Sequence, residues 1–315
     1  MLYMIMLCSI AANSAVLDWK QRWPNGASLT VWLQQPTPLQ QSIVTQAFRQ
    51  WEAHVNLTFN ITVEKPKKSH IRVAFHSYDG SILGKQNHLT SSEPTMLLAS
   101  LSEQTIELSR KKRIALHEVG HILGFEHEFR HPDWPYGYRW QEAEIERCVE
   151  KLKNEPSYCE NLSAMIRKEG MRQLPFDRQS IMNYPFSLNQ LDNTLSDIPI
   201  SLKLSPADKL AAAVAYPRSL NSPEHKGYHV RFRSFCATKV HVRWSASGSL
   251  FNPTLVILSP GETSDWLTLE KPYIKFKGTT HDGENLWSPN MPQGYAIIAD
   301  TGWPTSGLEL PLYCQ

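Results

Sequence analysis

The spacing of apolar residues over the first 125 positions predicts strands and helices around one sheet. Residues 29–33, which follow a turn signal at 23–26, are predicted to form a strand. A helix begins at Pro38, and its apolar residues fall on one stripe. These residues are Ile43, Ala47, Trp51 and Val55. Further extended segments are expected at 57–63, 71–75 and 96–101. A second helix, with Ile114 and Ile122 on its apolar face, should end at Gly124, because glycine tolerates the left-handed backbone that closes helices.

The pattern changes after residue 127. The chain is irregular and rich in Trp, Pro and Tyr at 131–140, and a helix is predicted from about 141 to 153. Ser205 followed by Pro206 is typical of a helix start, with serine as the N-cap and proline at the first helical position. This helix is expected to end at Pro217, because proline cannot continue it.

A polar stretch at 219–226 separates these segments from short runs of β-branched and aromatic residues. The runs lie at 230–232, 240–244, 255–258 and 273–276. Turn signals recur between them, which is expected of a small β-sandwich. The predicted organisation is therefore a segment at 1–15, an α+β domain at 16–220 and a β-sandwich-like module at 225–315.

The first fifteen residues form an apolar run that ends in small side chains at 12–15. Such a run resembles a short signal peptide, and it predicts a secreted protein. The positively charged start of a signal peptide is missing, so a buried first strand is the alternative. No later stretch of about 18 uninterrupted apolar residues exists, so the mature chain is expected not to span a membrane.

Composition and charge narrow the class of protein. The chain has 315 residues, of which 41% are hydrophobic and 20% charged, as expected of folded globular domains. The formal net charge is +2, which provides no basic field that would attract nucleic acid or an anionic membrane. We therefore expect neither as a partner.

The cysteines fit an exported chain. Cys8 would be removed with the signal peptide, and four remain. Four cysteines allow three pairings, and the pairing that keeps each bridge within one domain joins Cys148 to Cys159 and Cys236 to Cys314. The alternative is four reduced thiols in a cytosolic protein.

One segment reads His-Glu-Val-Gly-His-Ile-Leu-Gly-Phe-Glu-His. His117 and His121 are four positions apart, so they share one helix face and can bind the same ion. Gly124 allows the chain to leave the helix and bring His127 round as a third ligand. Glu118, beside the first ligand, then faces the metal-bound water. A helix whose histidines merely pack is the alternative, but so many polar residues on one face have no packing rationale.

The motif H-E-x-x-H-x-x-G-x-x-H resembles that of the metzincin metallopeptidases, whose second signature is a methionine turn. Residues 180–184, Ser-Ile-Met-Asn-Tyr, are similar to the astacin version of that turn, and Glu128 directly after the third histidine is also astacin-like. The resemblance implies one catalytic Zn²⁺ and a methionine, Met182, beneath the histidines. It also implies that Tyr184 is a fifth ligand or a hydrogen-bond donor to the reacting carbonyl.

This resemblance covers residues 20–217. It implies an α+β fold in which a twisted sheet and two long helices lie above a mostly irregular lower half, with the substrate cleft between them. Astacins usually begin as zymogens in which a propeptide supplies an aspartate to the zinc. We expect no such segment between Ala15 and Trp23, and Asp18 lacks the family's surrounding motif. The partner of Glu128 is therefore left open.

The expected reaction is hydrolysis of peptide bonds in protein or peptide substrates. Zinc would polarise the scissile carbonyl, Glu118 would act as general base and then as acid, and Tyr184 would stabilise the oxyanion. Two alternatives remain: a binding protein whose C-terminal module recognises a surface or glycan on a degenerate peptidase scaffold, and a hydrolase of non-peptide amides. The intact histidines and Glu118 argue against the binding protein.

Other conspicuous residues are given structural roles. Residues 111–113, Lys-Lys-Arg, are expected to form a solvated turn. The histidines at 70, 76 and 88 are expected to be polar surface positions. The C-terminal tryptophans could form a sugar-binding surface, but most are expected to lie in the core of the β-module. They are Trp244, Trp266, Trp287 and Trp303.

Overall fold

The computed structural model describes a large part of the chain, in separate ranges. They are residues 14–18, 21–86, 93–128, 172–174, 177–183, 199–218, 228–246, 253–269, 273–281, 286, 295–298 and 307–314. Several predictions from the sequence lie outside these residues. They concern the first thirteen residues, His88, the helix at 141–153 with Cys148 and Cys159, Tyr184, Trp287 and Trp303.

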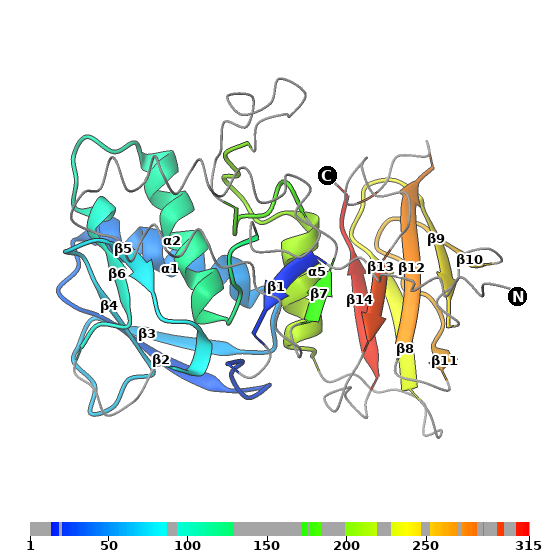
Figure 1. Ribbon diagram of the computed structural model, residues 1–315, viewed down its shortest axis with the longest axis horizontal. Coiled ribbons are helices and arrows are strands. Elements are labelled where there is room, and N and C mark those ends of the chain that lie inside the picture. The colour runs from blue at the N-terminus through cyan, green and yellow to red at the C-terminus, as the bar shows by residue number, and fades with distance from the viewer. Residues whose placement is uncertain are drawn as a thin grey trace, which may run out of the picture.

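The N-terminal half contains a five-stranded sheet (Figure 1). Its strands are β2 (Ser28–Leu33), β3 (Thr58–Thr62), β4 (Ile71–Ala74), β5 (Asp79–Ser81) and β6 (Met96–Leu98). Their spatial order is β3-β2-β4-β6-β5. The first four are parallel, and β5 runs antiparallel to β6 at the edge. The predicted strands at 29–33, 57–63 and 71–75 are present, whereas β5 was not predicted.

Two long helices, α1 (Pro38–Glu52) and α2 (Leu108–Ile122), lie above β2 and β3 in Figure 1. Helix α1 begins where the sequence predicts it, with Thr37 as N-cap in a capping box. The predicted apolar stripe is buried in the core. The ring nitrogen of Trp51 donates a 2.8 Å hydrogen bond to the carbonyl of Leu116, which links the two helices.

The prediction of a solvated turn at 111–113 is wrong. These residues belong to the first turns of α2, which starts at Leu108, and Lys111 and Arg113 are buried. Their charged ends reach backbone carbonyls, Lys111 that of Leu101 and Arg113 that of Asn183. The segment predicted as a strand at 96–101 also ends earlier, because residues 99–101 form the 3₁₀ helix η2 (Ala99–Leu101). A second 3₁₀ helix, η1 (Gly84–Gln86), follows β5.

A smaller set of elements lies to the right of the C-terminal end of α2 in Figure 1. Strand β1 (Ser14–Leu17) pairs antiparallel with β7 (Arg172–Leu174), and helix α5 (Pro206–Ala215) lies beside them. Leu17 forms an isolated β-bridge with Phe125, the residue that directly follows Gly124. The last two positions of the predicted signal peptide, residues 14 and 15, thus lie in β1.

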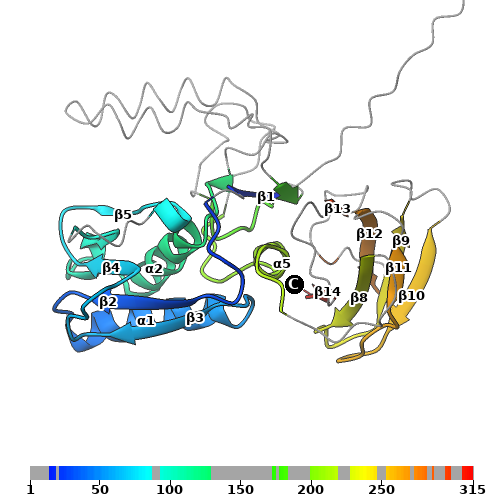
Figure 2. The same cartoon turned by 90° about the horizontal axis from the view of Figure 1, so that it is seen from below.

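Residues 228–314 contain only strands as regular elements in their described part (Figure 2). They are β8 (Tyr228–Ser234), β9 (Val240–Ser245), β10 (Thr254–Leu258), β11 (Leu267–Leu269), β12 (Tyr273–Thr280), β13 (Tyr295–Ile298) and β14 (Leu308–Leu312). They form a four-stranded sheet, β10-β9-β12-β13, and a three-stranded sheet, β11-β8-β14. The rings of Phe232 and Phe276, one from each sheet, lie 5.1 Å apart in the core. Trp244 and Trp266 are half-buried.

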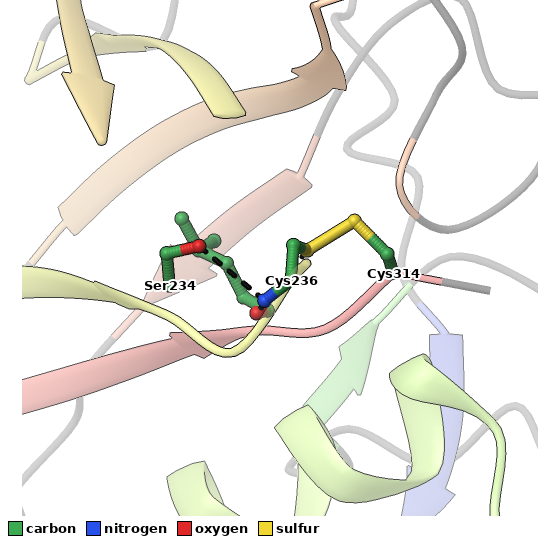
Figure 3. The surroundings of a disulfide bond; sticks show 4 residues. Ser234, Cys236 and Cys314 are labelled. Carbon is green, nitrogen blue, oxygen red and sulfur yellow. Dashed lines mark hydrogen bonds between the residues drawn. A yellow bond between two sulfur atoms is a disulfide. The ribbon is translucent and has the colours of Figure 1, made fainter. Parts of the chain in front are cut away.

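The disulfide predicted between Cys236 and Cys314 is present (Figure 3). It ties the residues after β8 to those after β14, and these two strands pair in parallel. The last strand also contacts the part of the chain that precedes these two sheets, because α5 packs against β14. No helix within the described ranges is long and apolar enough to cross a membrane.

Candidate metal centre

Three histidines meet at the C-terminal end of α2. His117 and His121 project from the helix with their ring centroids 4.8 Å apart. Gly124 follows the helix with a positive φ of 95°, a backbone conformation that glycine adopts without strain. The chain then turns back, so that the His127 ring lies 4.5 Å from that of His121 and 5.2 Å from that of His117. The sequence therefore predicted both the helical pair and the role of the glycine.

The donor set fits a zinc ion. One potential ligand atom from each histidine lies within 4.8 Å of the others, and this is the only such group of histidine, cysteine or carboxylate residues in the ranges described above. The Nε2 atoms of His121 and His127 are 3.1 Å apart. Two nitrogens bound to one tetrahedral zinc at roughly 2.0–2.1 Å would be separated by about 3.3 Å. The observed spacing is close to that value.

Backbone carbonyls orient the first two rings. Nδ1 of His117 donates to the carbonyl of Ile181 at 2.8 Å, and Nδ1 of His121 donates to that of Phe125 at 2.7 Å. These bonds place the proton on Nδ1, so Nε2 keeps its lone pair for a metal. Burial holds the pKa of His117 well below its usual value. The imidazole is therefore neutral, as a ligand must be.

Glu118 is buried beside the histidines. Its Oε2 accepts a 2.7 Å hydrogen bond from the hydroxyl of Ser81, which also lies 3.0 Å from the Glu118 backbone carbonyl. The pKa of Glu118 is raised to about 7, chiefly by burial; the Ser81 hydrogen bond opposes this increase and the charge of Asp79 adds to it. A carboxyl that titrates near neutral pH can both take and return a proton.

The segment at 177–183 forms the floor of the site. Met182 is buried against Gly120, the helix residue between the two ligands. A Cβ atom at position 120 would lie only 2.3 Å from Met182 Sδ, so glycine is required for this approach. The sequence predicted Met182 beneath the histidines, and the structure places its sulfur against Gly120 of α2. Tyr184 lies outside the described residues.

Three buried carboxylates lie in this segment or bind to it. Asp208, from α5, accepts hydrogen bonds from the Ser180 hydroxyl at 2.6 Å and the Ile181 amide at 2.9 Å. Glu128 accepts from the Asp177 amide at 2.7 Å, and its own amide donates to Met182. Burial raises the pKa of Asp177, and nearby Asp208 raises it further. The sequence left the partner of Glu128 open. In the structure Glu128 binds this segment, through the Asp177 amide and the Met182 carbonyl.

Sequence reasoning missed Ser81 and Asp208. Ser81 lies in a three-residue strand with little β-propensity, and it reaches Glu118 across 37 positions of sequence. Asp208 could have been recognised as the third helical residue after a serine N-cap, a position where a carboxylate often completes a capping box. Its contact with residues 180 and 181 had no signal in the sequence.

Comparison with known proteins finds a matching family and a similar structure. The family model described as Astacin (Peptidase family M12A) matches residues 15–200. The structure is similar to that of myroilysin, with a TM-score of 0.55 and 28% sequence identity over 65% of this chain and 100% of the myroilysin chain.

Two curated relatives are zinc metalloproteinases named dpy-31, from Teladorsagia circumcincta and Caenorhabditis elegans. Each is 28% identical over 151 residues, which is 47% of this chain. The match covers 21% of the first relative and 22% of the second. The chain thus matches about a fifth of the length of these relatives.

Proposed function

The chain belongs to the astacin family, peptidase family M12A, and from this premise we propose that it is a secreted zinc-dependent endopeptidase. The observation that carries the proposal is the convergence of His117, His121 and His127 beside the buried Glu118. The three histidines would hold one Zn²⁺. The substrates are proteins or peptides, which is the class that peptidases of this family act on.

Each residue of the proposed site has a separate chemical role. When bound, zinc would act as a Lewis acid that polarises the scissile carbonyl and makes water more acidic. Glu118 accepts the proton of the attacking water and returns it to the leaving amine nitrogen, which a pKa near 7 favours. The Ser81 hydroxyl fixes the position of the Glu118 carboxylate. Tyr184, by its place after Met182, is the proposed donor to the oxyanion.

Secretion and domain organisation are part of the proposal. The disulfide between Cys236 and Cys314 supports an oxidising compartment, because structural disulfides are rare in the cytosol. We assign residues 1–15 to a signal peptide, 16–220 to the peptidase domain and 225–315 to a β-sandwich-like module. The exclusively β character of the described part of 228–314 supports the last assignment.

Metal analysis and hydrolysis of a denatured protein together test the function. The purified chain should contain one zinc per molecule and cleave the denatured substrate. Changing both His117 and His121 to Ala should abolish zinc binding. Glu118→Gln should keep the metal but reduce turnover by about two to four orders of magnitude. Zinc without hydrolysis would favour the alternative of a binding protein on a degenerate scaffold, and absence of zinc would contradict the metal site.

A further inference from the structure

Helix α5 contacts the metal site indirectly, through one buried carboxylate. The Ile181 carbonyl accepts the Nδ1 proton of His117 at 2.8 Å, so the orientation of this peptide determines how the His117 ring is held. The nitrogen of the same residue donates to Asp208 Oδ2 at 2.9 Å. One residue of the floor segment therefore joins the zinc ligand to α5.

Asp208 holds this segment at more than one point. Its Oδ1 accepts the Ser180 hydroxyl proton at 2.6 Å, and the Ser180 oxygen in turn accepts the Met182 amide at 3.0 Å. Three consecutive residues, 180 to 182, are thus bound to one carboxylate directly or through Ser180. Asp208 is only 2% exposed, so water does not compete for these bonds.

The start of α5 fixes Asp208 itself. Ser205 is the N-cap, and its side-chain oxygen accepts the Asp208 amide at 2.9 Å. The Ser205 amide donates to Asp208 Oδ2, also at 2.9 Å. A carboxylate at this position normally serves only the helix end. Here it also binds the floor segment, so a rigid helix terminus determines the geometry of the turn.

From these contacts we propose that Asp208 is a positioning residue that orients the zinc ligand His117 through Ser180 and Ile181. The inference rests on the proposed function for its catalytic consequence, but the orientation of His117 is a property of the metal-free protein. The carboxylate suits this position because the Ile181 and Ser205 amides can only donate, and the Ser180 hydroxyl donates to it while accepting from Met182. An amide at this position would turn an NH₂ group towards at least one of them.

Asp208→Asn tests the inference with almost no change in side-chain volume. In the zinc-free full chain, nitrogen-detected NMR of the histidine rings should show His117 losing its single Nδ1–H tautomer. Zinc affinity, measured by competition with a chelator, should fall by about 10- to 100-fold, the usual range for a residue that supports a ligand. The kcat for a peptide substrate should fall with little change in KM.

Thr37→Ala is the matched control. It removes the N-cap hydroxyl of α1 and leaves Ser205 and Asp208 intact, so it should lower the melting temperature without changing the His117 tautomer or zinc affinity beyond about twofold. If Asp208→Asn does not fold, Ser180→Ala removes one of the bonds to the turn, and a loss of zinc affinity of several fold is expected.

The inference is overturned if the folded Asp208→Asn protein, or Ser180→Ala in its place, retains the wild-type tautomer and zinc affinity. It is also overturned if Thr37→Ala weakens zinc binding as much as Asp208→Asn, because the effect would then follow the overall stability of the protein. Failure of the proposed function would look different: the wild-type protein would not bind zinc or would not cleave protein, whereas the tautomer comparison would still give its result.

Discussion

Gly120 shows how one missing side chain shapes the metal site. It lies between His117 and His121 on α2, and its missing Cβ leaves room for the Met182 sulfur and the ring of Trp51. In an isolated helix, alanine would be more stable than glycine by about 1 kcal/mol. The overlap with Met182 opposes this gain, because a 2.3 Å approach requires the turn or the helix to move.

We therefore expect Gly120→Ala to lower the free energy of unfolding by about 1–3 kcal/mol, the usual cost of overpacking a core. Zinc affinity should fall as well, because the turn below Gly120 supplies the carbonyl that orients His117. Urea unfolding and chelator competition would measure the two effects. In the double variant with Met182→Ala, the two substitutions should cost less than their sum. Additive losses would show that the two residues do not compete for the same space.

The residues of the site differ in how far they can be predicted. The three histidines and Glu118 are close in sequence: helical spacing puts His117 and His121 on one face, Glu118 adjoins His117, and Gly124 lets the chain bring His127 back to the pair. Met182 was predicted from its resemblance to a known turn. Ser81 and Asp208 were not predicted, because their contacts depend on how a strand edge and a helix end pack against the site. The capping-box position of Asp208 indicates a helix start but not its contact with the turn.

The helices and strands also differ in how far the sequence predicts them. The helix begun by Thr37 and Pro38 was predicted correctly because the cap, the proline and the apolar stripe all agree. Strand β5 was missed because Asp79-Gly80-Ser81 has no β-branched or aromatic residue, and pairing with β6 determines its conformation. The turn predicted at 111–113 was wrong because charged residues were taken as exposed, whereas long side chains can bury their stems and still reach polar groups.

The bridge between Cys236 and Cys314 joins the ends of two paired strands, β8 and β14. The two cysteines are 78 positions apart in the sequence. In the chain-entropy model, a loop of that size stabilises the folded state by about 4 kcal/mol. Changing both cysteines to serine should therefore lower the free energy of unfolding by up to that amount. Tryptophan fluorescence during urea unfolding would measure it, with peptide mapping without reduction to verify the pairing. A loss below about 1 kcal/mol would mean that strand pairing alone fixes this end of the chain.

Residues after the end of α1 contact the end of the last strand, β14. Nδ1 of His54 and the hydroxyl of Tyr313 form a 2.8 Å hydrogen bond, and Tyr313 directly follows the β14 end and precedes the disulfide cysteine. The Lys209 ammonium of α5 lies 4.9 Å above the Tyr313 ring. The hydroxyl-to-imidazole bond thus connects a helix of the N-terminal half to the last strand, while α5 packs on the same strand.

This junction should weaken at low pH. Burial, together with the positive charges of Lys209 and Arg218, lowers the pKa of His54 from 6.5 to about 4. Between these values the unfolded chain binds more protons than the folded one, so stability is present above pH 6.5 and is lost as the pH falls towards 4. A shift of this size would correspond to about 3 kcal/mol, but His54 is only part-buried, so screening by solvent reduces the expected loss to about 1–2 kcal/mol.

His54→Gln should remove this part of the pH dependence, because glutamine keeps a hydrogen-bonding group for Tyr313 but does not titrate. The measurement is urea unfolding of the zinc-free protein at pH 7, 5.5 and 4.5, which excludes proton competition with the metal. His76→Gln, at an exposed position, is the matched control and should retain the wild-type slope. Relative to that of wild type, the unfolding free energy of His54→Gln should rise by about 1–2 kcal/mol as the pH falls. Parallel curves for the two proteins would mean that His54 remains neutral or solvated in both states, and that the hydrogen bond to Tyr313 does not couple the two halves to pH.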